Sequence, residues 1–289
     1  MKQAKSEKHS KKIDLHIHTY YSDGDCSPSD VVRMAYKQAV STIAITDHDT
    51  VSGLEEAITE GKRLGVEVIP GIEITTRNRG SVHILGYFPG KDIRCIEGIE
   101  ESLEATRQGR TQRTYEQIDL LNQDGYSITK EEVDVYRKGE FTSKVHVIKA
   151  MIEKGYIKKT KEGIKLMEDE HYDIHYSTEW AMKPEDAVAL INFYGGIAVL
   201  AHPGKLMKKH DINKFVQKLV KVGLKGLEIY SPKNSPEQMC CLSEIAEKYG
   251  LIGTYGTDFH REGSTKIGVV DGANINPADT IYHLKKSHK

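Results

Sequence analysis

Short apolar runs that end in histidine or acidic residues recur along this chain, and they constrain its fold more than any other feature. The first run, Ile13 to His18, ends in two histidines one residue apart. Because residues i and i+2 of a strand point to the same side, His16 and His18 present two imidazoles together. Two adjacent imidazoles are a natural grip for a metal ion, although two surface histidines in a loop would give the same pattern.

Similar strand ends follow along the chain, with predicted helices between most of them. The turn-rich loop after the first strand carries Asp23, and the later runs carry or end in His48, Glu73, His83, His202, Asp258 and His260. The alternation of strands and helices predicts a parallel sheet. In α/β barrels the active site lies at the carboxyl ends of the strands, so we expect these side chains to meet there.

The middle of the chain breaks this pattern. Residues 97–183 are charged and predicted to be helical, with helices over 100–122 and 143–154 and a capping-box signature of Thr129 followed by Glu132. We interpret this stretch as a helical insert, a lid or substrate domain, that leans over the mouth of a barrel formed by 13–96 and 184–289. The alternative is a separate helical domain with no part in the chemistry.

The composition restricts the partners and the compartment. With 41 basic and 42 acidic side chains among 289 residues, no long duplex nucleic acid is expected, whereas a nucleotide or short oligonucleotide is not excluded. The four cysteines show no CxxC spacing, which favours reduced thiols in a cytoplasmic protein. Residues 1–12 are lysine-rich and are predicted to be a disordered basic tail rather than a signal peptide. No apolar run approaches the length of a membrane span, and no oligomeric state is predicted.

Nine residues at these strand ends are candidate metal ligands: His16, His18, Asp23, His48, Glu73, His83, His202, Asp258 and His260. Six imidazoles and three carboxylates exceed the roughly four to six ligands that one Zn²⁺, Fe²⁺ or Mn²⁺ ion takes. With one or two bridging carboxylates, the set predicts a cluster of about two to three divalent metal ions, Mn²⁺, Fe²⁺ or Zn²⁺.

The order of the motifs resembles that of the PHP (polymerase and histidinol phosphatase) family. In chain order they are His-x-His at 16–18, Ser-Asp-Gly at 22–24, Thr-Asp-His-Asp-Thr at 46–50, Gly-Ile-Glu at 71–73, His-Ile-Leu-Gly at 83–86, Leu-Ala-His-Pro-Gly at 200–204 and Gly-Thr-Asp-Phe-His at 256–260. The chain most resembles the metal-dependent phosphoesterases of this family that act on nucleotide bisphosphates and RNA 5′ ends. The resemblance implies an α/β fold, a distorted (β/α)7 barrel with the helical insert over its mouth.

The resemblance also implies how the ligands divide. His16, His18, Glu73 and Asp258 would hold the first metal, Glu73 would bridge to a second held by His83 and His202, and Asp23, His48 and His260 would hold a third. The implied reaction is hydrolysis of phosphomonoesters of 3′,5′-bisphosphate nucleotides or of the 5′ ends of short RNA, by attack of a hydroxide that bridges two metals. The predicted catalytic residues are His48, Asp258, His260 and Lys144.

One motif of the helical insert departs from the family pattern. Where that subfamily reads Gly-Arg-Pro-His, with the arginine meeting substrate phosphate, this chain reads Ser-Lys-Val-His at 143–146. Lys144 would replace the arginine as a point charge, without its bidentate fork. The predicted substrate-binding residues are Lys144, His146 and Lys205. Four arginines are further candidates, interpreted mostly as a solvated helix face: Arg77, Arg107, Arg110 and Arg113.

Three alternative functions stay open. A histidinol-phosphate phosphatase is the alternative within the family. A barrel amidohydrolase that cleaves C–N bonds is the alternative within the fold, because such enzymes also use His-x-His metal sites. A metal-dependent binding module, such as an accessory domain of a polymerase, belongs to another class. Two acidic residues also have two interpretations: Asp49 orients an imidazole or caps the following helix, and Glu228 is a buried structural carboxylate or contacts a metal ligand.

Overall fold

The computed structural model describes residues 12–78, 81–172, 174, 180–208, 210–263, 265–270 and 277–286. Residues 1–11 of the predicted basic tail lie outside the described residues, and Lys12 is the first residue of a strand. Within these ranges, no helix combines the length and the apolar character that crossing a membrane requires.

One seven-stranded sheet carries the fold, with its strands in chain order. They are β1 (Lys12–Ile17), β2 (Val40–Ile45), β3 (Glu67–Arg77), β4 (Ser81–Tyr87), β5 (Ile197–Leu200), β6 (Gly226–Tyr230) and β7 (Ile252–Tyr255). All neighbouring pairs are parallel except that β4 runs antiparallel to both β3 and β5. The prediction of a parallel sheet is therefore wrong for β4. Only residues 78–80 separate β3 from β4, too few for the crossover that a parallel neighbour needs.

The two edge strands of the sheet are joined through the chain that follows β7. Ile17 forms an isolated parallel bridge with Phe259. The N–H of His18 donates to the carbonyl of Phe259 at 2.8 Å. This link brings the carboxyl end of β1 beside the residues that leave β7.

The carboxylate of Asp14, fully buried in β1, anchors the same link. It accepts hydrogen bonds from the backbone N–H groups of Thr257 and Gly268 at 3.0 and 2.8 Å. Burial raises the pKa of Asp14 to about 6, against the hydrogen bonds from Thr257 and Gly268. Gly268 lies in a turn and has a φ of +71°.

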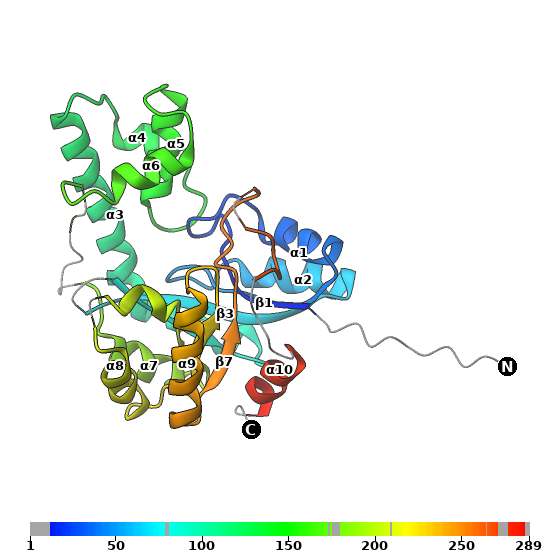
Figure 1. The fold of residues 1–289 in the computed structure, drawn as a ribbon. Coiled ribbons are helices and arrows are strands. Elements are labelled where there is room, and N and C mark those ends of the chain that lie inside the picture. Colours follow the sequence, from blue (N-terminus) through cyan, green and yellow to red (C-terminus); the bar gives the residue numbers. More distant parts are fainter. Residues whose placement is uncertain are drawn as a thin grey trace.

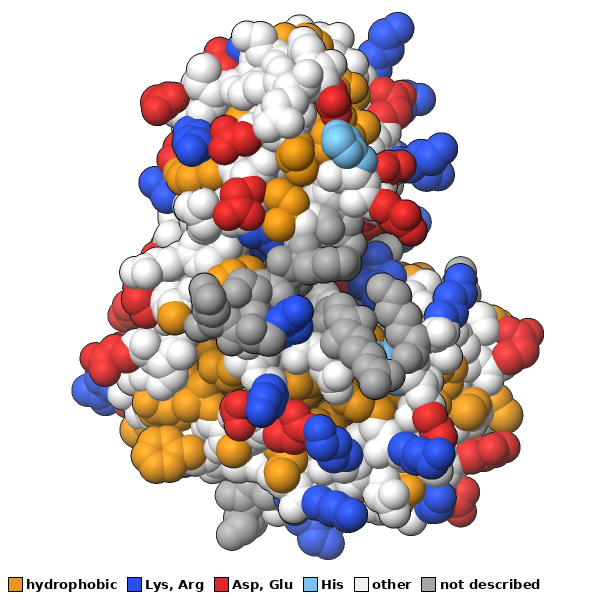
Figure 2. Space-filling model, turned by 90° about the vertical axis from the view of Figure 1, so that its left-hand side faces the viewer, with side chains coloured by type: hydrophobic (Ala, Val, Ile, Leu, Met, Phe, Trp, Pro, Cys, Tyr) orange, Lys and Arg blue, Asp and Glu red, His pale blue; other side chains and the backbone are white. Residues whose placement is uncertain are grey.

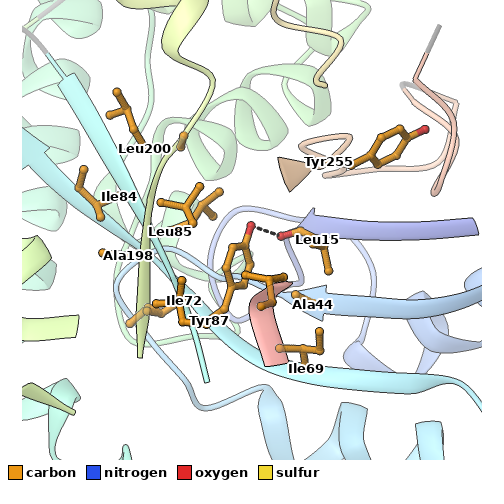
Figure 3. Close-up of a cluster of buried hydrophobic side chains, with 14 of the residues drawn as sticks. Leu15, Ala44, Ile69, Ile72, Ile84, Leu85, Tyr87, Ala198, Leu200 and Tyr255 are labelled. Atoms are coloured by element: carbon orange, nitrogen blue, oxygen red, sulfur yellow. Dashed lines mark hydrogen bonds between the residues drawn. The ribbon is translucent and has the colours of Figure 1, made fainter. Parts of the chain in front are cut away.

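Six helices pack around the sheet, namely α1 (Pro28–Lys37), α2 (Leu54–Leu64), α7 (Pro184–Phe193), α8 (Ile212–Val220), α9 (Pro236–Tyr249) and α10 (Pro277–Lys286), with two short 3₁₀ turns at Ile93–Cys95 and Pro203–Leu206. Their apolar stripes face inward; in α1, Val31, Val32 and Ala35 are fully buried. Figure 3 shows Tyr87 among the apolar side chains of the sheet, where its hydroxyl donates to the carbonyl of Leu15 at 2.9 Å. The core thus joins β1 to β4 and holds the strand ends in place.

The helical segment, residues 97–183, contains α3 (Ile99–Gln123), α4 (Lys130–Asp134), α5 (Lys144–Glu153) and α6 (Thr160–Met167). Figure 1 shows α4, α5 and α6 grouped above the sheet and connected to it by the long α3. The group has its own hydrophobic cluster, which includes Ile118 of α3 and Met151 of α5. The predicted capping box at Thr129 and Glu132 is confirmed, with both of its hydrogen bonds present. On the face shown in Figure 2, acidic and basic side chains are intermixed over this group.

Candidate metal centre

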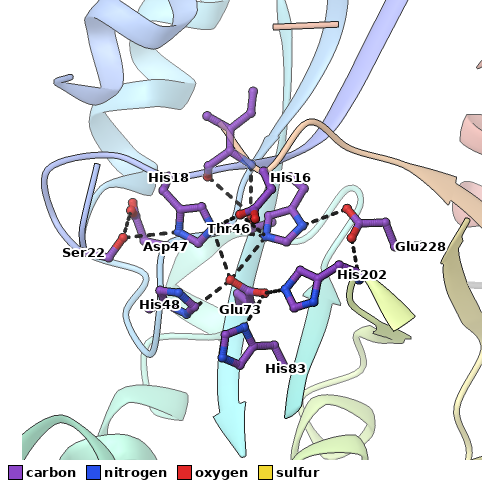
Figure 4. A network of polar contacts seen from close by, with 12 residues as sticks. His16, His18, Ser22, Thr46, Asp47, His48, Glu73, His83, His202 and Glu228 are labelled. Atoms are coloured by element: carbon purple, nitrogen blue, oxygen red, sulfur yellow. Dashed lines mark hydrogen bonds and ion pairs between the residues drawn. The ribbon is translucent and has the colours of Figure 1, made fainter. Parts of the chain in front are cut away.

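Glu73 lies at the centre of the strand-end residues. It belongs to β3 and is 1% exposed. Its Oε1 lies 3.0 Å from Nδ1 of His83 and 3.1 Å from Nε2 of His202. Its Oε2 lies 3.2 Å from a ring nitrogen of each of three further imidazoles, those of His16, His18 and His48. Figure 4 shows the five rings arranged around this one carboxylate.

Two other carboxylates complete the set. Asp258 Oδ1 lies 3.4 Å from Nε2 of His16 and 3.3 Å from Nε2 of His18. Asp23 Oδ1 lies 3.2 Å from Nε2 of His260 and 3.7 Å from Nδ1 of His18. The structure therefore brings together all nine residues that the sequence singled out as candidate ligands.

The local backbone explains how the strand ends deliver these side chains. His16 is in β1 and His18 is the first residue after it, so the strand's alternation brings both rings to the same side. Two of the nine candidate ligands have a positive φ although neither is glycine, His202 with φ of 28° and Asp258 with φ of 53°. Such conformations are costly and persist where the surrounding structure enforces them. Here they turn two side chains back toward Glu73.

Three groups have ligand atoms within 4.8 Å of one another, and each could hold an ion: His16, His18, Glu73 and Asp258; His18, Asp23, His48 and His260; and His48, Glu73 and His83. The first group has the predicted membership. The second has His18 in addition to the predicted residues, and the third has His48 where His202 was predicted. His202 remains within 3.1 Å of Glu73.

The donor atoms suit divalent cations. Oε2 of Glu73 and Nδ1 of His48 are buried 3.2 Å apart, yet neither makes a well-directed hydrogen bond among the described residues, although buried polar atoms are almost always hydrogen-bonded. Burial alone would raise the pKa of Glu73, but the imidazoles of His16 and His48 hold that pKa well below its usual value. Burial lowers the pKa of His48, which favours the neutral ring that binds metals. A mixed set of imidazoles and carboxylates is what Mn²⁺, Fe²⁺ and Zn²⁺ accept as ligands.

Glu228, fully buried in β6, holds two of these histidines. Its Oε1 lies 2.8 Å from Nδ1 of His16, and its Oε2 accepts the backbone N–H of His202 at 2.6 Å. Of the two interpretations of Glu228, the contact with candidate metal ligands is the one observed.

Asp49 does not cap a helix, and the interpretation as a cap is wrong. Its Oδ1 accepts the backbone N–H of Thr75 at 2.7 Å, and its Oδ2 pairs with Arg110 at 3.1 Å. The interpretation of the arginines as a solvated helix face is wrong for Arg107 and Arg110, which are buried. Packing against the loop after β2, rather than any sequence pattern, removes them from solvent.

A cavity of about 730 Å³ opens onto the metal-centre residues and is lined by the sheet side and by the helical segment. Its cationic side chains come from both sides: Arg110, Arg113, Lys144 and Lys161 from the helical segment, and Lys205, Lys233 and Arg261 from the loops after the strands. Of the predicted substrate-binding residues, Lys144 and Lys205 line this cavity, and Lys144 is paired with Glu168 at 3.0 Å. His146 lies instead behind this wall, 2% exposed, where its Nδ1 accepts the N–H of Ser143.

Sequence reasoning missed Lys233. Its ammonium lies 3.6 Å from Oδ2 of Asp258, with that of Lys205 at 4.0 Å from the same oxygen. Lys233 follows β6 by three residues, so its place after a strand end was a usable signal. Asn234 connects the loop of Lys205 with the loop of Lys233. It accepts a hydrogen bond from the N–H of Gly204 and donates to the carbonyls of Glu228 and Ile229.

An α/β sheet with buried imidazoles and carboxylates at its strand ends defines a class of metal-dependent proteins. The chain belongs to the PHP domain family, whose model matches residues 14–231. It is a metal-dependent phosphoesterase, a hydrolase of this family.

Three curated relatives align over most of their length. The chain is 31% identical to a 5′-3′ exoribonuclease of Haemophilus influenzae, covering 86% of this chain and 90% of the relative. It is 30% identical to a 3′,5′-nucleoside bisphosphate phosphatase of Chromobacterium violaceum, over 87% and 88%. It is 32% identical to a phosphoribosyl 1,2-cyclic phosphate 1,2-diphosphodiesterase of Eggerthella lenta, over 86% and 93%.

Two crystal structures match the fold at a TM-score of 0.80, each with 27% identity and 96% coverage of both chains. One is a Bifidobacterium adolescentis protein described as a proposed metal-dependent phosphoesterase. The other is a Chromobacterium violaceum protein described as an amidohydrolase, with bound sulfate and no metal.

Proposed function

We propose that this enzyme hydrolyses phosphomonoesters of nucleotides that carry more than one phosphate, either 3′,5′-bisphosphate nucleotides or the 5′ ends of short RNA. The observation that carries the proposal is the cavity. It is lined by candidate metal ligands and by cationic side chains, which come both from the helical segment and from the loops after the strands. A substrate with one phosphate at the metals and another at the lysines and arginines matches this distribution of charge. The names of two relatives, an exoribonuclease and a bisphosphate phosphatase, support it.

The proposal assigns the nine strand-end residues as ligands of two to three divalent ions, with Glu73 shared between ions. When bound, such ions supply Lewis acidity and lower the pKa of coordinated water toward about 7. In this assignment the sheet is a distorted (β/α)7 barrel, and the helical segment is a lid over its mouth.

The remaining residues bind and orient the substrate. Lys205 and Lys233, held on one side of Asp258 by Asn234, donate hydrogen bonds to oxygens of the phosphate that reacts. Lys144 begins α5, where its side chain is about one-third exposed, and its ammonium leaves Glu168 to meet a second phosphate. Two phosphate contacts fix the ester bond relative to the metal-ligand residues, which lowers the entropic part of the barrier.

One substrate panel tests the proposal. Protein reconstituted with Mn²⁺ is given adenosine 3′,5′-bisphosphate, a 5′-phosphorylated trinucleotide, a ribose 1,2-cyclic phosphate, histidinol phosphate and an N-acyl amide, and phosphate, nucleotide and amine release are measured. We expect release from the first two at rates at least about tenfold above the others. Equal turnover of histidinol phosphate, or amine release without phosphate release, would contradict the proposal and support one of the alternatives.

Two aspartates of one loop provide matched variants for the same assay. Asp23 lies 3.2 Å from His260, whereas Asp25, two residues on, is exposed and pairs with Lys149 at 2.7 Å. We expect Asp23→Asn to lower kcat by about 100-fold or more and Asp25→Asn to change it by less than about threefold. Circular dichroism of both variants verifies that the fold is retained. Comparable kcat values for the two variants would remove Asp23 from the catalytic centre.

A further inference from the structure

One face of α3 contacts the loop that carries His48. The contacts come from Glu100, Arg107 and Arg110, whose spacing of seven and three residues places them on the same side of a helix. Glu100 Oε1 accepts hydrogen bonds from Thr50 Oγ1 at 2.7 Å and from the N–H of Val51 at 2.6 Å. The helical segment therefore touches the metal centre through its longest helix, in addition to lining the cavity.

Asp49 is the residue on which these contacts converge. Arg107 donates to its carbonyl at 3.0 Å, and Arg110 pairs with its Oδ2 at 3.1 Å. Arg110 also donates from the same nitrogen to Oγ1 of Thr75, while Thr75 donates its N–H to Oδ1 of Asp49. A guanidinium, a carboxylate and β3 are thus joined in one closed set of hydrogen bonds.

The backbone around Asp49 needs such support. Its φ of 55° lies in the left-handed region, which is strained for a residue other than glycine. Its N–H donates to the carbonyl of Glu73, and the N–H of Glu73 donates to the carbonyl of Asp47. His48 lies between these two hydrogen bonds, so the conformation of Asp49 decides where the ring of His48 stands relative to Glu73.

We infer that Arg110 is a positioning residue for the metal centre, acting through Asp49 on His48. Its side chain is 9% exposed, and its guanidinium lies 4.5 Å above the ring of Phe141. The helical segment thereby supports metal binding in the sheet below it, beyond any contact with substrate. This inference rests on the proposed metal centre but on no particular substrate.

Replacement of Arg110 tests the inference through metal binding. Mn²⁺ is titrated into metal-free protein, and the free ion is measured by its paramagnetic resonance signal. In Arg110→Met protein, we expect the Mn²⁺ affinity of the weakest site to fall about tenfold. Gln117→Met is the matched control. Gln117 lies seven residues further along the same face of α3, is fully buried and donates to the carbonyl of Tyr172, far along the chain from the His48 loop. We expect its Mn²⁺ affinity to equal that of the unmodified protein.

Two further variants keep the test decisive if Arg110→Met does not fold. Asp49→Asn keeps the shape of Asp49 but loses its charge, and it should lower Mn²⁺ affinity to a similar extent. Arg110→Lys should fall between, because an ammonium does not reproduce the planar fork. In the double variant Arg110→Met/Asp49→Asn, the two losses of Mn²⁺ affinity should not add, because both substitutions remove the same interaction.

Two outcomes would overturn the inference. Unchanged Mn²⁺ affinity in Arg110→Met with a raised KM would make Arg110 a substrate contact instead. Fully additive losses in the double variant would mean that Arg110 and Asp49 act separately. Since Mn²⁺ binding is measured without substrate, failure of the proposed nucleotide specificity would leave this test intact.

Discussion

Glu228 is not a candidate metal ligand, but it holds two residues that are. Its two carboxylate oxygens are both used, one at the ring of His16 and the other at the backbone of His202. The first contact makes Nδ1 of His16 a donor, which leaves the lone pair of Nε2 for a metal ion. Partners of this kind orient a ligating imidazole and raise its basicity.

Glu228→Gln tests this role with almost no change in volume. The amide has an NH₂ group where the carboxylate has an oxygen. This NH₂ faces either Nδ1–H of His16 or the N–H of His202, so two donors meet and that hydrogen bond is lost. We expect Mn²⁺ affinity to fall by about 10-fold to 100-fold, measured by competition with a chelating dye. Glu67→Gln, at the exposed first residue of β3 and paired with Lys285, is the control. Equal affinities for the two variants would show that Glu228 serves packing alone.

At the scale of elements, the helical segment and the loop after β1 meet backbone to backbone. A Cβ built on Gly139 would lie 1.9 Å from the carbonyl oxygen of Tyr21. Asp23 stands two residues beyond Tyr21, so this contact lies next to the metal centre. Glycine is required here by close approach, because no larger residue fits without moving one of the two segments.

Gly139→Ala should separate the two segments. We expect a loss of about 1–3 kcal/mol of unfolding free energy from overpacking, together with a raised KM for nucleotide substrates. Gly163→Ala is the comparison, because its Cβ would meet only side chains of the helical segment, 2.7 Å from Ile148. Denaturant unfolding and steady-state kinetics measure both effects. If Gly163→Ala raised KM as much as Gly139→Ala, the interface with the loop after β1 would not be the cause.

At the scale of the whole molecule, the candidate ligands come from nearly the full length of the chain, from His16 to His260. The link between Ile17 and Phe259 that joins the edges of the sheet lies between ligands at both ends. An ion held by His16, His18 and Asp258 would connect the same two strand ends, so that metal binding and closure of the sheet would stabilise each other.

Removal of metal should consequently destabilise the whole fold. Ions present at about 100 times their Kd contribute about 2.7 kcal/mol, which corresponds to about 5–10 °C in Tm for a domain of this size. Calorimetry before and after chelation, and after return of Mn²⁺, measures the shift. In Glu73→Gln protein the shift should be much smaller. If the Tm of the unmodified protein changed neither on chelation nor on return of Mn²⁺, the cluster would not bind metal.

Sequence reasoning succeeded for the strands and their ends because both leave a local signal. The run before His16 alternates apolar residues, and the run before Asp47 is mostly apolar. It failed for β4, since a hairpin and a parallel neighbour look alike when only an apolar run is considered. It also failed for Arg107 and Arg110, because α3 has charged residues along its whole length and only packing against the His48 loop buries some of them.

The chain's own sequence determined the types of residue at the strand ends, and with them the metal chemistry, because imidazoles and carboxylates at alternate positions of short apolar strands need no long-range information. The tertiary structure decided which of these residues lie close enough together to hold one ion, placing His48 beside Glu73 and His83. It also decided that Arg110 supports a loop 61 residues away, through its ion pair with Asp49. Such contacts depend on how helices and loops pack in three dimensions, which no periodicity of the sequence records.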